Sequence, residues 1–221
     1  MAEYKGIKGF KVQYLDQDPV PTVAGWSSGN NMNTARLGLG GAGTQTAALA
    51  FGGYTTPPEP TGNTGATEEY DGTSWANNPT GLNTPRRYFA GAGTQTAGLG
   101  FGGVNVTGNT AATEEYDGAT WTSSNNLNTA RKYLAGCGTQ TAGLGAGGQT
   151  PPVAITGATE LYDGTSWTNS PASLGTSRYR VAGAGTQPLG LCIGGYTTTS
   201  LANTEEFTIT GTAGIKTVTV T

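Results

Sequence analysis

Large and very small side chains alternate in a short stretch that recurs four times along the chain. In residues 97–102, Leu99 and Phe101 fall on one face of an extended chain, and Gly98 and Gly100 fall on the other. A strict period of two is typical of a β-strand, whose successive side chains point to opposite faces. We expect the bulky face of each strand to pack into the small-residue face of the adjoining sheet. The other copies occupy residues 47–52, 142–147 and 189–194.

This stretch belongs to a longer repeat with a period of about 47 residues. Each copy ends in a double glycine, and an element such as EEYDGTSW (68–75) follows, shortened to EEF (205–207) in the fourth copy. No segment has an apolar stripe of period 3.6, so no helix is predicted. The period suits the blades of a propeller.

The EEYDGTSW element predicts a β-hairpin. Asp71-Gly72 stands between a strand that ends at Tyr70 and one that starts at Thr73, and this dipeptide favours a type I′ turn. Each repeat then supplies four strands, of the kind of RRYFAGAG, TAGLGFGG, ATEEY and TSW. Four-stranded units at this spacing predict an all-β fold, a β-propeller of four modules.

Composition supports a folded chain and gives no basis for binding nucleic acid or an anionic membrane. Glycine is abundant, at 38 of 221 residues, but the net charge is only −3, whereas disorder usually combines low hydrophobicity with high charge. That charge gives no basis for binding nucleic acid. No apolar run would span a bilayer, and we expect no signal peptide. The predicted domains are an N-terminal strand or attachment segment (1–22), the propeller (23–210) and a C-terminal strand (211–221).

Catalytic chemistry is poorly represented. The chain has no His, which excludes an ordinary catalytic triad and imidazole metal ligands. Adjacent carboxylates such as Glu68-Glu69 point to opposite faces of a strand and make a poor acid–base couple. Cys137 and Cys192 are interpreted as small side chains buried in the core. We therefore expect no enzyme, no cofactor and no metal site.

Residues that recur in every copy are interpreted as structural. One Arg and one Glu per repeat suggest either a ring of cations that clamps an acidic ligand or ion pairs within or between blades, and the equal numbers favour ion pairs. The recurring Tyr and Trp are interpreted as packing between strands, and the Thr-Gln pairs as turn caps. The structural set comprises Arg36, Arg86, Arg131, Arg178, Glu68, Glu114, Glu160, Glu205, Trp26, Trp75, Trp121 and Trp167.

Residues that differ between copies are the better candidates for binding. The segments after each double glycine vary in length and sequence, and loops on a rigid scaffold are where binding sites are usually built. The candidates there are Tyr54, Asn105, Gln149 and Tyr196. The alternative is that these segments are plain connectors.

The landmarks together resemble the kelch repeat. An Arg, a double glycine, and a Tyr followed five residues later by Trp recur in register, as in Arg86, Gly102-Gly103, Tyr116 and Trp121. Kelch propellers usually have six or seven blades, whereas this chain offers four modules. The fourth has Phe207 in place of Tyr, and no Trp follows it. The sequence of the repeats, as in NTARKYLAGCGTQTAGLGAGG, is similar to that of kelch-type proteins of marine bacteriophages.

That similarity implies a non-enzymatic component of the virion, in the tail or a fibre, which binds a host-surface glycan or protein. The implied partners are other virion or tail proteins, a host glycan, and further copies of the chain in a homo-oligomer. The implied location is the virion, assembled in the host cytoplasm. A purely structural decoration protein is the alternative, and a polysaccharide-degrading enzyme ranks third.

The ends of the repeat raise the question of ring closure. Trp26 has no Tyr-Asp-Gly before it, and Phe207 has no Trp after it. We predict that the strand around Trp26 completes the fourth blade and closes the ring. Alternatively, the segments 9–15 and 214–221, which also alternate, build a fifth blade together or pair with another subunit.

Overall fold

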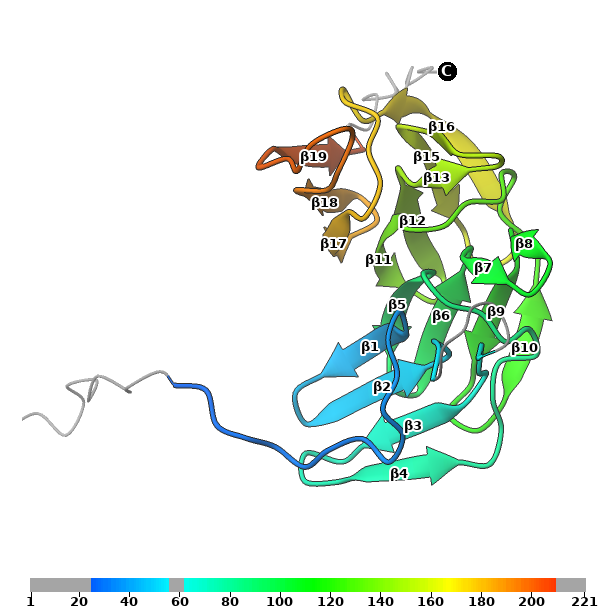
Figure 1. Ribbon diagram of the computed structural model, residues 1–221, viewed down its shortest axis with the longest axis vertical. Coiled ribbons are helices and arrows are strands. Elements are labelled where there is room, and N and C mark those ends of the chain that lie inside the picture. Colours follow the sequence, from blue (N-terminus) through cyan, green and yellow to red (C-terminus); the bar gives the residue numbers. More distant parts are fainter. Residues whose placement is uncertain (1–24, 56–61, 210–221) are drawn as a thin grey trace, which may run out of the picture.

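The computed structural model of the protein describes residues 25–55 and 62–209, and these ranges consist of strands, turns and loops. Four small antiparallel sheets follow one another as the blades of a β-propeller, which confirms the predicted fold class (Figure 1). The described residues contain no helix with the length and hydropathy to cross a membrane.

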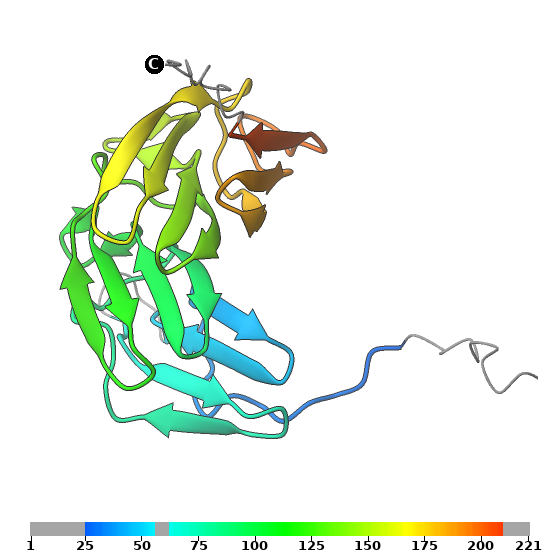
Figure 2. The same ribbon diagram turned by 180° about the vertical axis from the view of Figure 1, so that it is seen from behind.

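Each blade follows the chain outward from the concave side of the array, strand by strand (Figures 1 and 2). The first blade comprises β1 (Gly40–Thr44), β2 (Ala47–Phe51), β3 (Thr67–Tyr70) and β4 (Trp75–Asn78). The second comprises β5 (Ala90–Thr94), β6 (Ala97–Phe101), β9 (Thr113–Tyr116) and β10 (Trp121–Ser124). The third comprises β11 (Ala135–Thr139), β12 (Ala142–Ala146), β15 (Ala158–Tyr162) and β16 (Trp167–Ser173). The fourth comprises β17 (Ala182–Thr186), β18 (Leu189–Ile193) and β19 (Thr204–Thr208).

Two small hairpins follow the second strand of the two middle blades. The second blade carries β7 (Val104–Asn105) and β8 (Gly108–Asn109), and the third carries β13 (Gln149–Thr150) and β14 (Ala154–Ile155). The innermost strands pack in series, β1 on β5, β5 on β11 and β11 on β17.

The hydrophobic core lies between blades, as the alternating pattern predicts. Leu49 and Phe51 of β2 are fully buried and belong to one cluster with Trp121 of the second blade. A Cβ placed on Gly98 would lie 2.9 Å from the Leu49 side chain, and one on Gly100 would lie 2.9 Å from the Phe51 ring. The glycines are therefore seats for the bulky side chains of the preceding blade.

The Asp-Gly hairpins form, but their turn differs from the prediction. Tyr70 pairs directly with Trp75, so the loop has four residues instead of two. The Asp71 carboxylate accepts hydrogen bonds from the backbone N–H groups of Thr73 (2.8 Å) and Ser74 (2.7 Å). These bonds lower the pKa of Asp71 and favour this loop over a type I′ turn, in which Asp71 itself would need a positive φ.

The predicted closure by the strand around Trp26 is wrong for the described residues. The fourth sheet has three strands, and Trp26 lies outside every strand with its side chain fully exposed. Figure 1 shows the dark blue segment that starts at residue 25 in the lower half of the molecule and β19 near the top, so this segment does not reach the open edge of the fourth sheet. The alternatives that involve segments 9–15 and 214–221 lie outside the described residues.

Candidate functional site

Each blade holds one arginine–glutamate pair that joins its strands, and both side chains of the pair are buried in the first three blades. Arg131 is typical: its Nη2 lies 3.0 Å from the Glu160 carboxylate, and its Nη1 donates to the carbonyl oxygens of Gly147 (3.0 Å) and Ala158 (2.6 Å). Glu160 also accepts the backbone N–H of Asn128 at 2.7 Å. The equivalent pairs are Arg36–Glu68, Arg86–Glu114 and Arg178–Glu205.

None of these four paired arginine side chains reaches the surface to hold a ligand. All four arginine side chains have no exposed area. Burial lowers the pKa of Arg86 and Arg131, and the charge of the paired glutamate opposes that shift. Since guanidinium groups keep their proton at any ordinary pH, the pairs are ionic and hold strands of one blade together.

The recurring glutamines bridge neighbouring blades, which corrects their interpretation as turn caps. Gln95 Nε2 donates to the carbonyl oxygens of Ala48 (3.1 Å) and Tyr70 (2.7 Å) in the preceding blade. Gln140 and Gln187 make the same pair of bonds one blade further on. The partner lies in another repeat, so the local sequence gives no sign of it.

The four binding candidates from the sequence lie just after the second strand of each blade. Tyr54 is 6% exposed, and Arg87 lies over its ring at 5.3 Å. Asn105 Oδ1 accepts the N–H of Thr107 at 2.9 Å and so shapes the β7–β8 turn. Gln149 pairs with Lys132, and Tyr196 pairs with Tyr179, through isolated backbone bridges. The structure therefore distributes these four over separate blades, and only Tyr196 meets the aromatic row described next.

The residues two positions after each recurring Arg, one from each blade, lie together in the structure. Tyr88, Tyr133 and Arg180 have φ angles of 57°, 57° and 55°, which non-glycine residues rarely adopt. The backbone N–H of Tyr133 donates to the carbonyl of Tyr88 at 2.8 Å, and that of Arg180 donates to Tyr133 at 2.9 Å. Gly38 holds this position in the first blade, and its carbonyl oxygen accepts the backbone N–H of Tyr88 at 2.8 Å.

The side chains at these positions contact one another and Tyr179, and we name the four the tyrosine row (Tyr88, Tyr133, Tyr179 and Arg180). The rings of Tyr88 and Tyr133 lie 4.5 Å apart, and those of Tyr133 and Tyr179 lie 5.9 Å apart. The Arg180 guanidinium lies 5.2 Å from the centre of the Tyr133 ring. Tyr196 extends the row beyond Tyr179, with an edge-on contact at 5.6 Å. Non-glycine residues in strained conformations cluster at functional sites, because the surrounding structure must hold them there.

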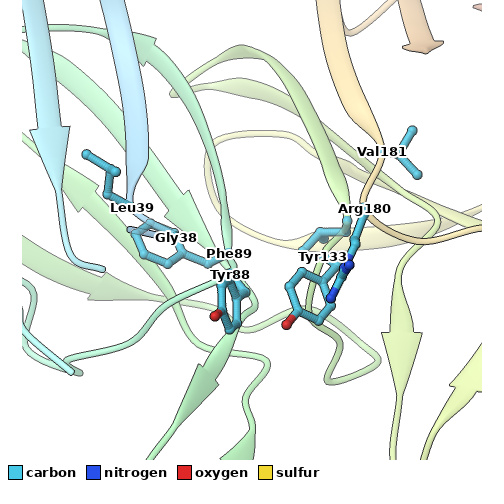
Figure 3. Close-up of a pocket in the computed structure, with 8 residues that line it drawn as sticks. Gly38, Leu39, Tyr88, Phe89, Tyr133, Arg180 and Val181 are labelled. Carbon is cyan, nitrogen blue, oxygen red and sulfur yellow. The ribbon is translucent and has the colours of Figure 1, made fainter. Parts of the chain in front are cut away.

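A shallow cavity of about 320 Å³ opens beside the tyrosine row (Figure 3). Its buried floor is apolar, and Figure 3 shows the hydroxyl groups of Tyr88 and Tyr133 and the guanidinium of Arg180 on the same side. Each blade contributes two consecutive residues: Gly38-Leu39, Tyr88-Phe89, Tyr133-Leu134 and Arg180-Val181.

The sequence does contain a signal for this cavity, outside the segments that follow the double glycines. The residue two positions after the recurring Arg is Tyr in the two middle repeats and differs in the first and fourth. The series is Gly38, Tyr88, Tyr133 and Arg180. This variation lies at the start of the expected inner strand RRYFAGAG. The structure corrects that strand, because β5 begins only at Ala90, after the turn at Tyr88.

The two cysteines are buried, unpaired thiols, as predicted. Burial raises the pKa of Cys137, and burial together with the neighbouring Cys137 raises that of Cys192 to about 11. Such thiols carry little thiolate at neutral pH. Among the described residues, no group of three or more acidic or Cys side chains is placed to hold a metal ion.

No protein-family model matches the chain, and no curated protein matches it.

Proposed function

We propose that the protein is a non-enzymatic binding module of a phage virion, and that its central cavity binds an acidic glycan of the host surface. One observation carries the glycan part of this proposal: Tyr88, Tyr133 and Arg180 line a single cavity from three consecutive blades. The kelch and phage assignment rests on the sequence resemblance alone.

The chemistry of the cavity fits a sugar ring with a carboxylate. Tyrosine presents an apolar face, which packs on the C–H face of a pyranose, and a hydroxyl that bonds to sugar hydroxyl groups. The guanidinium of Arg180 matches a carboxylate in a two-pronged arrangement. Since Arg180 is exposed at the rim, it is available to a ligand that rests on the two rings.

The binding test uses an array of neutral and uronic-acid oligosaccharides, followed by calorimetry on the best ligand. Tyr133→Gly removes the ring yet suits the positive φ, because Gly38 occupies this position in the first blade. We expect Tyr133→Gly to weaken binding about tenfold, which corresponds to about 1.4 kcal/mol for one lost stacking surface.

Two further variants separate the parts of the site. Arg180→Gln should remove the preference for acidic over neutral sugars, and Tyr133→Phe should keep most of the affinity. Val153→Ala, an exposed apolar change on the β13–β14 hairpin, is the control that should bind like the wild type. An array and a pull-down with host envelope that both give no binding would contradict the glycan proposal and favour the decoration role.

The virion part has its own test. Mass spectrometry of purified particles of the source phage should detect the protein in the tail or fibre fraction. Its absence from particles would contradict that assignment without affecting the glycan result.

A further inference from the structure

Successive blades are joined by three side-chain interactions that repeat around the propeller. The first is the glutamine bridge, in which Gln95 donates to two carbonyl groups of the blade before it. The second is a hydroxyl–carboxylate bond from Tyr116 to Glu69. The third joins Trp121 Nε1 to Thr67 Oγ1 at 2.8 Å. The third blade makes the last two with Tyr162–Glu115 and Trp167–Thr113.

A steric fit accompanies these bonds. The leucine in the middle of each second strand lies over a small residue of the next blade, as Leu49 lies over Gly98. A Cβ placed on Gly143 would lie 2.7 Å from the Leu99 side chain, and a Cβ placed on Gly190 would lie 3.2 Å from the Leu144 side chain. The interface is therefore directional, with knobs on one face of each blade and seats on the other.

The first blade carries the half of this interface that lies on the seat side, and no blade precedes it among the described residues. Gln45, Tyr70 and Trp75 stand where Gln95, Tyr116 and Trp121 stand in the second blade. Within the described residues, Gln45 makes no side-chain hydrogen bond and is exposed. Tyr70 has no carboxylate partner there, and Trp75 has no threonine partner. Ala48 takes the place of the seat Gly98.

The fourth blade carries the matching half on the knob side, and no blade follows it among the described residues. Gly190 pairs with Phe207 in the register of Ala48 with Tyr70, so both present the carbonyl groups that a glutamine would reach. Glu206 stands where Glu69 does, and Leu191 stands where Leu49 does. A hollow of about 260 Å³ lies on this face, lined by residues that include Leu191, Glu206 and Phe207.

The exposed apolar side chains of this end argue that it is covered. Leu189 is 64% exposed and Ile193 is 41% exposed, whereas Phe101, the counterpart of Ile193 in the second blade, is fully buried. All five residues of β17 are exposed, whereas β5 and β11 each have two buried residues. The terminal units of a repeat protein need a polar outer face to remain soluble, and this one lacks it.

The segment before the first blade is placed like the missing strand of the fourth blade. Gly29 follows Trp26 by three positions, as Asn78 follows Trp75. Asn78 Nδ2 lies 2.6 Å from the hydroxyl of Tyr116, and a Cβ on Gly29 would lie 3.3 Å from that of Tyr70. Gly29 thus lies against the first blade where the outer strand of a preceding blade would lie, and residues 27–30 line a hollow of about 540 Å³ together with Gln45 and Tyr70.

A second copy supplies that preceding blade more readily than the same chain. The largest contacts between blades join only neighbours in the chain, and none of these joins the fourth blade to the first. Figures 1 and 2 show the dark blue segment from residue 25 in the lower half of the molecule and β19 near the top. Both halves of the interface are thus free within one described chain, which suits a head-to-tail contact between two chains.

We propose that the fourth blade of one copy docks on the first blade of a second copy, and that two copies close a ring of eight blades. Gln45, Tyr70 and Trp75 of one chain meet the Gly190 and Phe207 carbonyls, Glu206 and Thr204 of the other. Residues 26–29 pair with β19 of the other chain and complete its fourth blade. Eight blades lie within the range of known propellers, and a head-to-tail contact that repeats twice closes without free ends.

The test is light scattering after size exclusion on the full chain and on two variants. The wild type should have twice the 22.3 kDa mass of the chain. Ile193→Arg blocks the knob face and Ala48→Arg blocks the seat face, so each variant alone should have the mass of one chain. Mixed in equal amounts, they should return to twice that mass, because one unblocked knob face meets one unblocked seat face.

The controls are Val106→Arg and Val153→Arg, which change residues 64% and 68% exposed on the small hairpins and should leave the mass of the wild type unchanged. Circular dichroism of every variant checks that the blades are folded. A wild type with the mass of one chain, a mass above two chains, or a mixture that stays at one chain would overturn the proposal.

A covalent trap separates exchange between chains from closure within one chain. Phe207 and Trp26 should be opposite each other, as Tyr116 and Trp121 are in the second blade. Mixed Phe207→Cys and Trp26→Cys chains should then form a disulfide-linked pair under oxidation. Monomers on the non-reducing gel would indicate closure within the chain and contradict the proposal.

Discussion

At the scale of the residue, this protein keeps ionic and hydroxyl groups inside its blades by giving each of them several partners. Two charges removed from water lose hydration, and their mutual attraction offsets this only with good geometry and further hydrogen bonds. Arg131 meets that condition with Glu160 and two backbone carbonyls. Tyr162 meets it between blades, where its hydroxyl contacts Glu115 and Ser124.

Tyr162 provides a prediction about alkaline pH. Its burial, and then its hydrogen bond to Glu115, raise the pKa of Tyr162 to about 12, against about 10 for a free tyrosine. The bond therefore contributes its full stability below pH 10 and loses it as the pH rises toward 12, because only the unfolded chain ionises in that window. Tyr162→Phe should be less stable than the wild type at pH 8, by about 1 kcal/mol.

The measurement is the free energy of unfolding in urea for both proteins from pH 8 to pH 12. The difference between them should shrink as the pH approaches 12. A difference that stays constant over this range would show that the hydroxyl is not the group that titrates.

At the scale of the element, the alternating strand carries most of the fold. The period of two predicts the strands, their bulky faces and the glycine seats from local sequence, and the structure confirms each of them at Leu49, Phe51, Gly98 and Gly100. The predicted type of the turn at Asp71 was wrong, because the Asp71 carboxylate itself accepts the backbone N–H groups of Thr73 and Ser74.

The candidate site was less predictable, for a physical reason. Tyr88, Tyr133 and Arg180 come together only through a backbone with positive φ and through hydrogen bonds between blades. The hydrogen bonds between blades have no signature in the residues, and the positive φ has only an indirect one, Gly38 at this position of the first repeat, where glycine is the usual choice. The sequence therefore directed attention to the segments after the double glycines, where only Tyr196 proved to contact the row.

The seats make a sharp prediction at this scale. In Gly143→Ala the added Cβ would lie 2.7 Å from the Leu99 side chain, so we expect a loss of about 1–3 kcal/mol in the free energy of unfolding. Gly175→Ala is the control, because its Cβ would have an ordinary contact of 3.4 Å with Glu205. Leu99→Ala should remove the clash, so the double variant should lose less than the two single changes together.

At the scale of the whole molecule, the propeller is a series of blades whose stability depends on the interfaces between them. In such a series the total is close to a sum of terms for each repeat and for each contact between neighbours. Ring closure depends on the angle between blades and on what meets the two ends, and neither is encoded in the pattern of a single repeat. This explains why the sequence correctly identified Trp26 and Phe207 as unmatched but did not place them.

If two chains share the ring, folding and association are coupled, and stability depends on protein concentration. The melting temperature of the wild type should therefore rise by a few degrees over a roughly 100-fold increase in concentration. That of Ala48→Arg should not change, because its seat face is blocked and each chain melts alone. Val106→Arg, whose altered side chain lies on the β7–β8 hairpin, should follow the wild type. Melting temperatures for the wild type that are independent of concentration would mean that the interface between chains adds nothing to stability, and the two open ends would then require another explanation.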